Sequence, residues 1–217
     1  TNVYKGEIQG QSLGIDVDIF NEDGNSVASK GELVVKKPFP TMPIKFWGDK
    51  KGVKYHDAYF SKFKNIWHHG DYIEITKNNG FIIRGRSDAT LNPGGVRIGT
   101  AEIYQQVENI DFITEGLVIG QNFNNDVRVV LFVTTKNNKE LDNEKIKFIK
   151  SKIRMNCSPK HVPSKIIKTP EIPRTKSGKI VELAVRKIIN GEEINNIEAI
   201  ANPHSLDFFK NLKELKN

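Results

Sequence analysis

The chain has 217 residues, a length that suits one or two domains with a well-buried core. Its net charge of +7 comes from scattered Lys and Arg without a block of five or six like charges, which disfavours a nucleic-acid-binding protein and suits an enzyme with anionic substrates. A single cysteine, Cys157, excludes an internal disulfide framework. No apolar run reaches the ~20 residues that span a membrane, and no signal peptide is visible. We therefore expect a cytoplasmic protein without a membrane partner.

The first third of the chain predicts β-structure. Four segments show the period-two or apolar patterns of strands: residues 15–19, 31–35, 72–75 and 81–84. The polar run between the last two indicates a hairpin. Three prolines break regular structure between the second and third strands, where a short helix is expected at residues 56–63.

The pattern changes near residue 85, where a polar break precedes a compact α+β unit. Its expected helices and strands, in chain order, are a helix at 100–108, strands at 113–119 and 127–134, a helix at 141–153, a strand at 164–168 and a helix at 181–189. Thr100 is a plausible N-cap, and the nearly all-apolar strand at 127–134 is expected at the centre of the sheet. The tail to Asn217 is helical at best. We predict an α+β fold, with a β-rich segment at 1–86 and a three-stranded sheet with flanking helices in 87–217.

The loop Pro173–Ile180 concentrates positive charge, with three cations in six residues around a Ser-Gly turn. The glycine permits a tight turn, and such a loop can present a lysine to an anion. It is not a phosphate-binding P-loop, because Pro173 and Ile180 stand where that motif needs Gly and Ser or Thr. A solvated basic loop is the alternative interpretation.

Trp67–Asp71 contains two histidines and an acid. Asp71 could bind a diol such as ribose, or could serve only as a turn acceptor. His68 and His69 are neighbours, and on an extended chain they point to opposite faces, which disfavours a shared metal ion. We expect no metal site here, and we interpret Cys157 as an ordinary thiol because no His or acid pattern accompanies it.

Glycines recur in the next two segments, Gly85–Asp88 and Asn92–Ile103. Their spacing does not fit the dinucleotide fingerprint G-x-G-x-x-G. The pair Gly94 and Gly95 permits close approach of a ligand to the backbone, and equally permits a plain tight turn.

The order and spacing of these four motifs resemble the adenylate-forming family, which includes acyl-CoA synthetases, luciferases and peptide-synthetase adenylation domains. The resemblance covers essentially the whole chain. Finer likenesses, to the branch that activates acetoacetate, lie in residues 37–43, 85–103, 126–133 and 172–186 and in the tail at 201–203. Acetyl- and propionyl-activating enzymes share the Gly-Thr-Ala-Glu-Ile element but typically lack the Asn-Pro-Gly-Gly form.

The resemblance implies a two-step reaction. A carboxylate, here acetoacetate or another short-chain acid, attacks the α-phosphate of Mg²⁺-ATP, and the CoA thiol then displaces AMP from the acyl-adenylate. By the same resemblance, Lys179 contacts the carboxylate and α-phosphate, Asp71 holds the ribose hydroxyls, and Arg86 contacts ribose or phosphate nearby.

The remaining implied sites concern the joint and CoA. Asp88 stands where the family has its hinge between a large and a small domain, and rotation there would bring the Gly94-Gly95 loop toward the pantetheine channel. Arg97 is a weaker candidate for the nucleotide phosphate, and Arg154 for the CoA phosphates.

The departure from the family pattern is large. The Ser/Thr-Gly-rich phosphate loop, the adenine-side acidic motif, the Mg²⁺ ligands and most of the acid-selecting pocket would belong to a large N-terminal domain that precedes these residues. The chain begins at Thr1 rather than Met, and we expect that start to be a cut. We expect this C-terminal part alone to be inactive. The alternatives are another short-chain acyl-CoA synthetase and a non-catalytic basic binding module, whose binding would depend strongly on salt.

Overall fold

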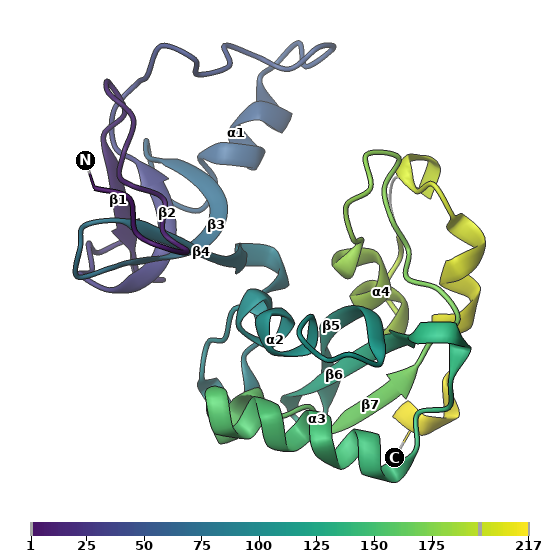
Figure 1. Cartoon of the computed structure of the whole chain (residues 1–217). Coiled ribbons are helices and arrows are strands. Elements are labelled where there is room, and N and C mark those ends of the chain that lie inside the picture. Colours follow the sequence, from purple (N-terminus) through teal and green to yellow (C-terminus); the bar gives the residue numbers. More distant parts are fainter. Residues whose placement is uncertain (1, 195–196, 217) are drawn as a thin grey trace. The chain divides into compact units, whose positions relative to one another are not determined.

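A computed structural model describes residues 2–194 and 197–216 of the chain. The chain divides into two compact units, Thr1–Asp88 and Ala89–Asn217. Figure 1 colours them from purple to teal and from teal to yellow, respectively. The expected boundary after residue 86 lies two residues before this division, and each unit is described by itself.

The first unit is built on a four-stranded antiparallel sheet whose strands are neighbours in chain order. Its elements are β1 (Val17–Phe20), β2 (Lys30–Val35), α1 (Val53–Tyr59), β3 (Trp67–Ile75) and β4 (Phe81–Arg86). The hairpin expected around residues 77–80 joins β3 to β4. All four expected strands are therefore present.

Two expectations for this unit need correction at the aromatic residues. The helix expected at 56–63 begins at Val53 and ends at Tyr59. The segment Trp67–Asp71 is part of strand β3 rather than a turn before it. The reason is packing, because the buried Trp67 ring stacks on Tyr59 at 3.7 Å between centroids, which fixes the end of the helix against the start of the strand.

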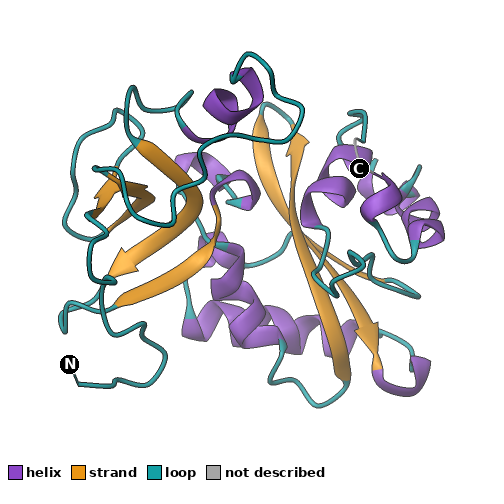
Figure 2. Ribbon diagram, turned by 90° about the horizontal axis from the view of Figure 1, so that it is seen from above, coloured by secondary structure: helices purple, strands orange, loops and turns teal. Residues whose placement is uncertain are grey.

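The second unit contains the expected three-stranded sheet with flanking helices. Its strands are β5 (Ile113–Phe123), β6 (Asp126–Thr135) and β7 (Lys165–Lys168), and its helices are α2 (Thr100–Val107), α3 (Asn143–Asn156) and α4 (Glu182–Ile189). Strand β6 lies in the centre, antiparallel to β5 and parallel to β7. Figure 2 shows the long β5–β6 pair from above.

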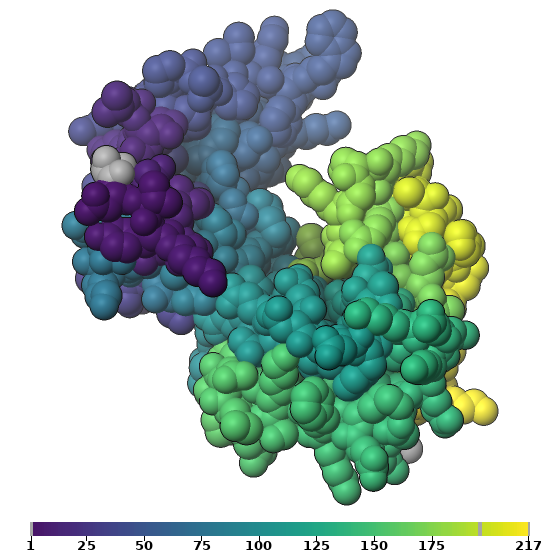
Figure 3. Space-filling model, viewed as in Figure 1, coloured from purple at the N-terminus to yellow at the C-terminus, as the bar shows by residue number. Residues whose placement is uncertain are grey.

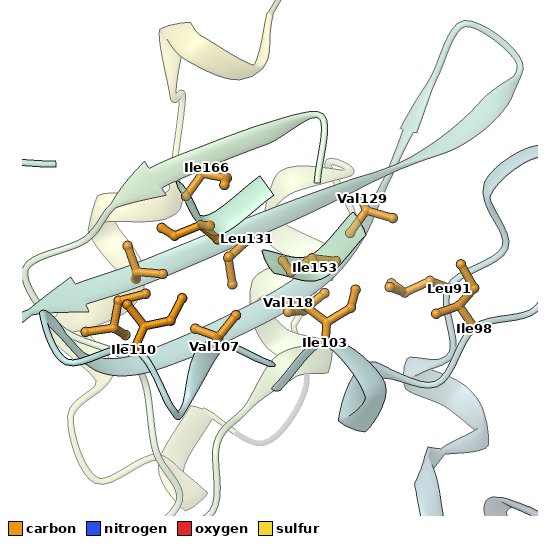
Figure 4. Close-up of a cluster of buried hydrophobic side chains, with 13 residues drawn as sticks. Leu91, Ile98, Ile103, Val107, Ile110, Val118, Val129, Leu131, Ile153 and Ile166 are labelled. Atoms are coloured by element: carbon orange, nitrogen blue, oxygen red, sulfur yellow. The ribbon is translucent and has the colours of Figure 1, made fainter. Parts of the chain in front are cut away.

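Hydrophobic side chains cover both faces of this sheet, which explains the all-apolar run in β6. On one face, Val118 and Leu131 pack with Ile149 and Ile153 of α3 and with residues of α2, as Figure 4 shows in part. On the other face, Phe132 packs with α4 and with the chain after residue 197.

That last segment is not an α-helix. It forms three short 3₁₀ helices at Ile197–Ala199, Pro203–Phe209 and Lys213–Leu215. Phe209 is buried and meets Phe132 edge-on at 4.9 Å between ring centroids. The tail, yellow in Figure 3, thereby covers one face of the sheet beside the yellow-green segment that leads into α4. None of the helices in the described residues is long and apolar enough to cross a membrane.

The predicted start of α2 needs correction, whereas the predicted end of α4 is confirmed. Thr100 is the first helical residue of α2, and the extended Gly99 before it is the N-cap and makes no side-chain cap bond. Thr100 is 3% exposed, so packing rather than capping places it. Helix α4 ends as expected at Ile189, with Asn190 as its C-cap and Gly191 next at φ 74°.

Candidate active site

Lys179 follows a hydrogen-bonded β-turn, with its side chain exposed to solvent. The turn closes through the Gly178 amide, which donates to the Thr175 carbonyl at 2.8 Å, and Gly178, its last residue, has a positive φ of 83° that favours glycine. The Thr175 amide donates to the Lys179 carbonyl, and the Lys179 amide donates to Thr175 Oγ1 at 3.1 Å. The backbone that carries the lysine is therefore held by Thr175 on both of its polar groups.

Arg174 braces the same turn from its base. Its guanidinium donates to the Gly178 carbonyl and to the carboxylate of Glu115 on β5, both at 2.5 Å. Two of the three cations noted in the sequence thus have different roles, because Arg174 is tied to the turn and to the sheet while Lys179 extends into solvent.

Helix α4 begins three residues after Lys179 and is anchored at its first turn. The Tyr104 hydroxyl of α2 donates to Glu182 at 2.5 Å and accepts from the Val118 amide of β5 at 3.0 Å. Burial, and then the Glu182 carboxylate, raise the pKa of Tyr104 well above its usual value, so this hydroxyl stays a donor. No sequence pattern predicts this contact, which joins residues 78 positions apart.

Asp71 and Arg86 come together in the first unit. They are register partners on β3 and β4, with Arg86 Nη1 at 3.3 Å from Asp71 Oδ1. Gly70 makes room for this pair, because a side chain there would lie 2.8 Å from the Arg86 guanidinium. Arg86 Nε also lies 3.7 Å from Asp88 Oδ1, in the short 3₁₀ turn Ser87–Ala89 where the first unit ends. The exposed arginine and the partly exposed Asp71 form a polar cluster able to bind a hydroxylated, anionic ligand.

Gly94 and Gly95 form a tight loop with φ of 58° and 76°. The Gly94 amide is taken by the carboxylate of Asp126, at 2.9 and 3.1 Å. Beside it lies an open hollow of about 570 Å³ whose lining residues are Asn92, Gly95 and the β5–β6 hairpin residues 122–127. Glycine is required here by the backbone conformation, because side chains are strained at this positive φ, whereas the nearby Lys160 ammonium is the end of a flexible side chain.

The two arginines of the second unit occupy different surroundings. Arg97 is half-buried and donates to Thr90 Oγ1 at 3.3 Å, one residue before the buried Ile98. Arg154 is exposed in the last turn of α3. Cys157, at the end of that helix, contacts the Glu102 carbonyl through its sulfur at 3.7 Å.

The two adjacent histidines bind different carboxylates. His68 contacts Glu32 at 2.9 Å, and His69 lies 3.4 Å from Asp71. Glu32 is fully buried and also accepts from Lys62 at 2.6 Å and from Ser87. Glu32 was not predicted as a functional residue. The sequence feature that indicates this network is an acid within the otherwise apolar strand Gly31–Val35.

Comparisons with known proteins complete the description of the site. No family model matches the chain. An acetoacetyl-coenzyme A synthetase of Rhizobium meliloti is 56% identical over 216 residues, which cover 99% of this chain and 33% of the relative. An acetoacetyl-CoA synthetase of Xenopus tropicalis is 46% identical over 218 residues, 99% of this chain and 32% of the relative. The solved acetoacetyl-CoA synthetase from Streptomyces lividans superposes with a TM-score of 0.90 at 39% identity, over 99% of this chain and 33% of that one.

The chain is homologous to one part of acetoacetyl-CoA synthetases. The resemblance to adenylate-forming enzymes, and to their acetoacetate-activating branch, is therefore confirmed over nearly the whole chain. The chain spans about a third of the length of the acetoacetyl-CoA synthetases it matches. Within that third the structure gathers Asp71, Arg86 and Asp88 in one unit, while Lys179, Gly94, Gly95, Arg97 and Arg154 belong to the other.

Proposed function

We propose that this chain is the lysine-bearing part of an AMP-forming acetoacetate–CoA ligase. Acetoacetate would attack the α-phosphate of ATP to give an acyl-adenylate and diphosphate, and CoA would then displace AMP. The observation that carries this proposal is the 56% identity to an acetoacetyl-CoA synthetase across 99% of the chain, together with an exposed Lys179 on an ordered turn.

The chemistry of the lysine suits the first half-reaction. As the carboxylate oxygen bonds to phosphorus, its negative charge moves onto the α-phosphate oxygens and onto the departing diphosphate. An ammonium group is a compact point charge that stabilises such a transition state without needing to transfer a proton. The ordered turn fixes the backbone of Lys179, so only the freedom of its side chain is lost when the ammonium engages the reacting groups.

The other assignments stand as parts of the same proposal. The Asp71–Arg86 cluster would take ribose and phosphate, because carboxylates accept from hydroxyls and arginine donates to phosphate. The Gly94-Gly95 loop would meet the pantetheine arm, Arg97 the nucleotide phosphate and Arg154 the phosphates of CoA. Asp88 would be the joint between the half-reactions.

The proposed reaction also needs groups from outside this chain. Among residues 2–194 and 197–216 no three His, Cys, Asp or Glu side chains gather as metal ligands. We expect Mg²⁺ to accompany ATP and to be bound by groups in the remaining part of the ligase. The remaining two-thirds of the ligase would supply the acid-selecting pocket.

The test uses the full-length protein that contains this chain. Acetoacetate, ATP and CoA should give AMP and acetoacetyl-CoA, with acetate and propionate as weaker substrates. Lys179→Ala should slow adenylate formation roughly 100- to 1,000-fold, the scale on which loss of one transition-state donor acts. Thioester formation from supplied acetoacetyl-adenylate should largely persist.

Lys176→Ala is the matched control, since Lys176 is a second exposed lysine in the same turn. It should leave both half-reactions within about threefold, the effect of a surface charge on substrate encounter. Equal loss of both half-reactions in Lys179→Ala would refute the assigned role. Preference for acetate or propionate over acetoacetate would instead assign the protein to another short-chain branch.

A further inference from the structure

The chain after residue 197 pairs with the lysine turn through its backbone. The Lys176 amide donates to the Ala199 carbonyl at 3.1 Å, and the Ala201 amide donates to the Arg174 carbonyl at 2.8 Å. These two bonds make Thr175 and Ile200 partners in an antiparallel bridge. Residues 199–202, which we call the tail strap, thus lie along the outer edge of the segment that leads into the turn.

Asn202 completes this pairing with its side chain. Its Oδ1 accepts from the Arg174 amide at 2.8 Å, and its Nδ2 donates to the Ile172 carbonyl at 3.1 Å. One primary amide therefore satisfies a donor and an acceptor on two residues that flank Pro173. Asparagine is suited to this position, because a carboxylate lacks the donor and an alanine lacks both groups.

The opposite edge of the same segment carries the lysine. Arg174 and Ile180 form a second antiparallel bridge, and the Val181 amide donates to the Pro173 carbonyl at 3.1 Å. Residues 173–176 consequently lie between two bridged segments, with the tail strap on one side and Lys179–Val181 on the other. The Arg174 carbonyl bonds to the tail strap and the Thr175 amide bonds to Lys179, so a shift of this segment moves the backbone of Lys179.

The tail strap is itself fixed to the folded unit. Ile200 is 5% exposed and belongs to the same hydrophobic cluster as Phe132, Val185 and Phe209. The Asn202 carbonyl accepts from the amide and hydroxyl of Ser205, which begins the buried part of the next 3₁₀ helix. The strap thus connects the turn to the packed face of the sheet.

We propose that the tail strap is a structural part of the lysine turn and that Asn202 is a positioning residue for Lys179. Asn202 holds the backbone of residues 172–174 in place, and it does not touch the reacting groups. The catalytic consequence rests on the proposed function above, whereas the structural consequence does not. Attack of the carboxylate on the α-phosphate, with loss of diphosphate, requires the ammonium to be placed within about 0.5 Å, which a segment anchored on both edges provides better than a loop anchored on one.

The structural consequence is tested on the 217-residue chain by limited digestion with trypsin. Lys176 and Lys179 are exposed cleavage sites, but cleavage requires the turn to open locally. Asn202→Ala should raise the initial cleavage rate at these two lysines roughly 5- to 30-fold, the shift in a local equilibrium that loss of two hydrogen bonds produces. Asn202→Asp, which keeps the acceptor for Arg174, should give an intermediate rate.

His204→Ala is the matched control on the same segment. Its side chain is exposed and pairs with Glu171 at 3.0 Å, away from the turn. It should leave cleavage at Lys176 and Lys179 unchanged. The far-ultraviolet circular dichroism of all variants should match the wild type, which separates local opening from unfolding.

The catalytic consequence is tested in the full-length protein through its two half-reactions. Asn202→Ala should lower the rate of adenylate formation roughly 10- to 100-fold, as expected when a reacting group is misplaced, and should leave thioester formation from supplied adenylate within about twofold. Asn202→Asp should recover part of the lost adenylation. His204→Ala should change neither.

Several results would overturn the inference. Unchanged trypsin cleavage in Asn202→Ala would show that the strap does not hold the turn. Faster cleavage with unchanged adenylation would show that the strap does not position Lys179, and equal loss of both half-reactions would indicate a general structural role. If the wild-type protein does not activate acetoacetate at all, the proposed function fails, while the trypsin result still decides whether the strap holds the turn.

Discussion

The carboxylate of Asp126 shows what one residue contributes to a loop. The Gly94 and Val127 amides both donate to it, and these bonds hold the pKa of Asp126 below its ordinary value of 3.8. Because the folded-state pKa is lowered, the contact is complete above the ordinary pKa and is lost as the pH falls through the lowered one. The Gly94 loop should therefore stay fixed at neutral pH and loosen only in strong acid.

This prediction is checked by following the ¹H and ¹⁵N chemical shifts of the Gly94 amide from pH 6 downward while the chain remains folded. The midpoint should lie below 3.8, and Asp126→Asn should remove that titration. A midpoint at or above 3.8 would show that the Gly94 contact does not stabilise the ionised carboxylate in solution.

Contacts of this kind could not have been predicted from the sequence. Gly94 and Asp126 are 32 residues apart, and Tyr104 and Glu182 are 78 apart. A motif such as Asn-Pro-Gly-Gly shows that the backbone must turn, and the positive φ of Gly94 and Gly95 agrees with that. It does not show which distant side chain will take the free amide, because that depends on how the sheet brings the β5–β6 hairpin to the loop.

Elements were predictable to the extent that their patterns depend on local burial. The alternation of apolar and polar residues correctly predicted β1, a strand in which Ile19 is buried and its neighbours are only partly buried. The apolar run correctly predicted β6, in which five consecutive residues are buried. The start of β3 was missed because the polar sequence His68-His69-Gly70-Asp71 resembles a turn, while the burial of Trp67 and Gly70 that makes it a strand is a tertiary effect. The tail was left open for the same reason, since short 3₁₀ helices have little periodicity of their own.

Packing of the tail against the sheet yields an element-scale prediction. Phe209 is 1% exposed and meets the fully buried Phe132, so its removal leaves a cavity that the three-stranded sheet cannot close. Phe209→Ala should lower the free energy of unfolding by about 3–5 kcal/mol. Urea unfolding followed by circular dichroism measures this change.

The control for that measurement is Phe148→Ala on α3, because Phe148 is 54% exposed. It should cost much less stability than Phe209→Ala. Comparable losses in the two variants would mean that the tail is not packed on the sheet as described, and the positioning role of the tail strap would lose its physical basis as well.

The whole molecule is divided where a joint was expected. The family resemblance implied a hinge at Asp88, which remains a prediction, and the chain divides into two compact units between Asp88 and Ala89. The chain spans about a third of its relatives, and the acid-selecting pocket of the proposed ligase is expected in the rest. The joint, in contrast, can be tested with residues at hand.

Asp88→Pro in the full-length protein should uncouple the two half-reactions. Proline fixes φ near −65° and restricts Ser87, so the rotation proposed at this joint loses the freedom on which alternation depends, while chemistry in the retained orientation continues. The ratio of adenylation to thioester formation, each measured in isolation, should change by roughly tenfold or more, the scale on which misplacement of a reacting group acts.

Asp88→Ala removes the same carboxylate, and its contact with Arg86, without fixing φ, so its ratio should stay within about twofold of the wild type. If Asp88→Pro lowered both half-reactions equally, or neither, the rotation proposed at residue 88 would be wrong, and the delivery of Lys179 would have to come from motion elsewhere in the chain.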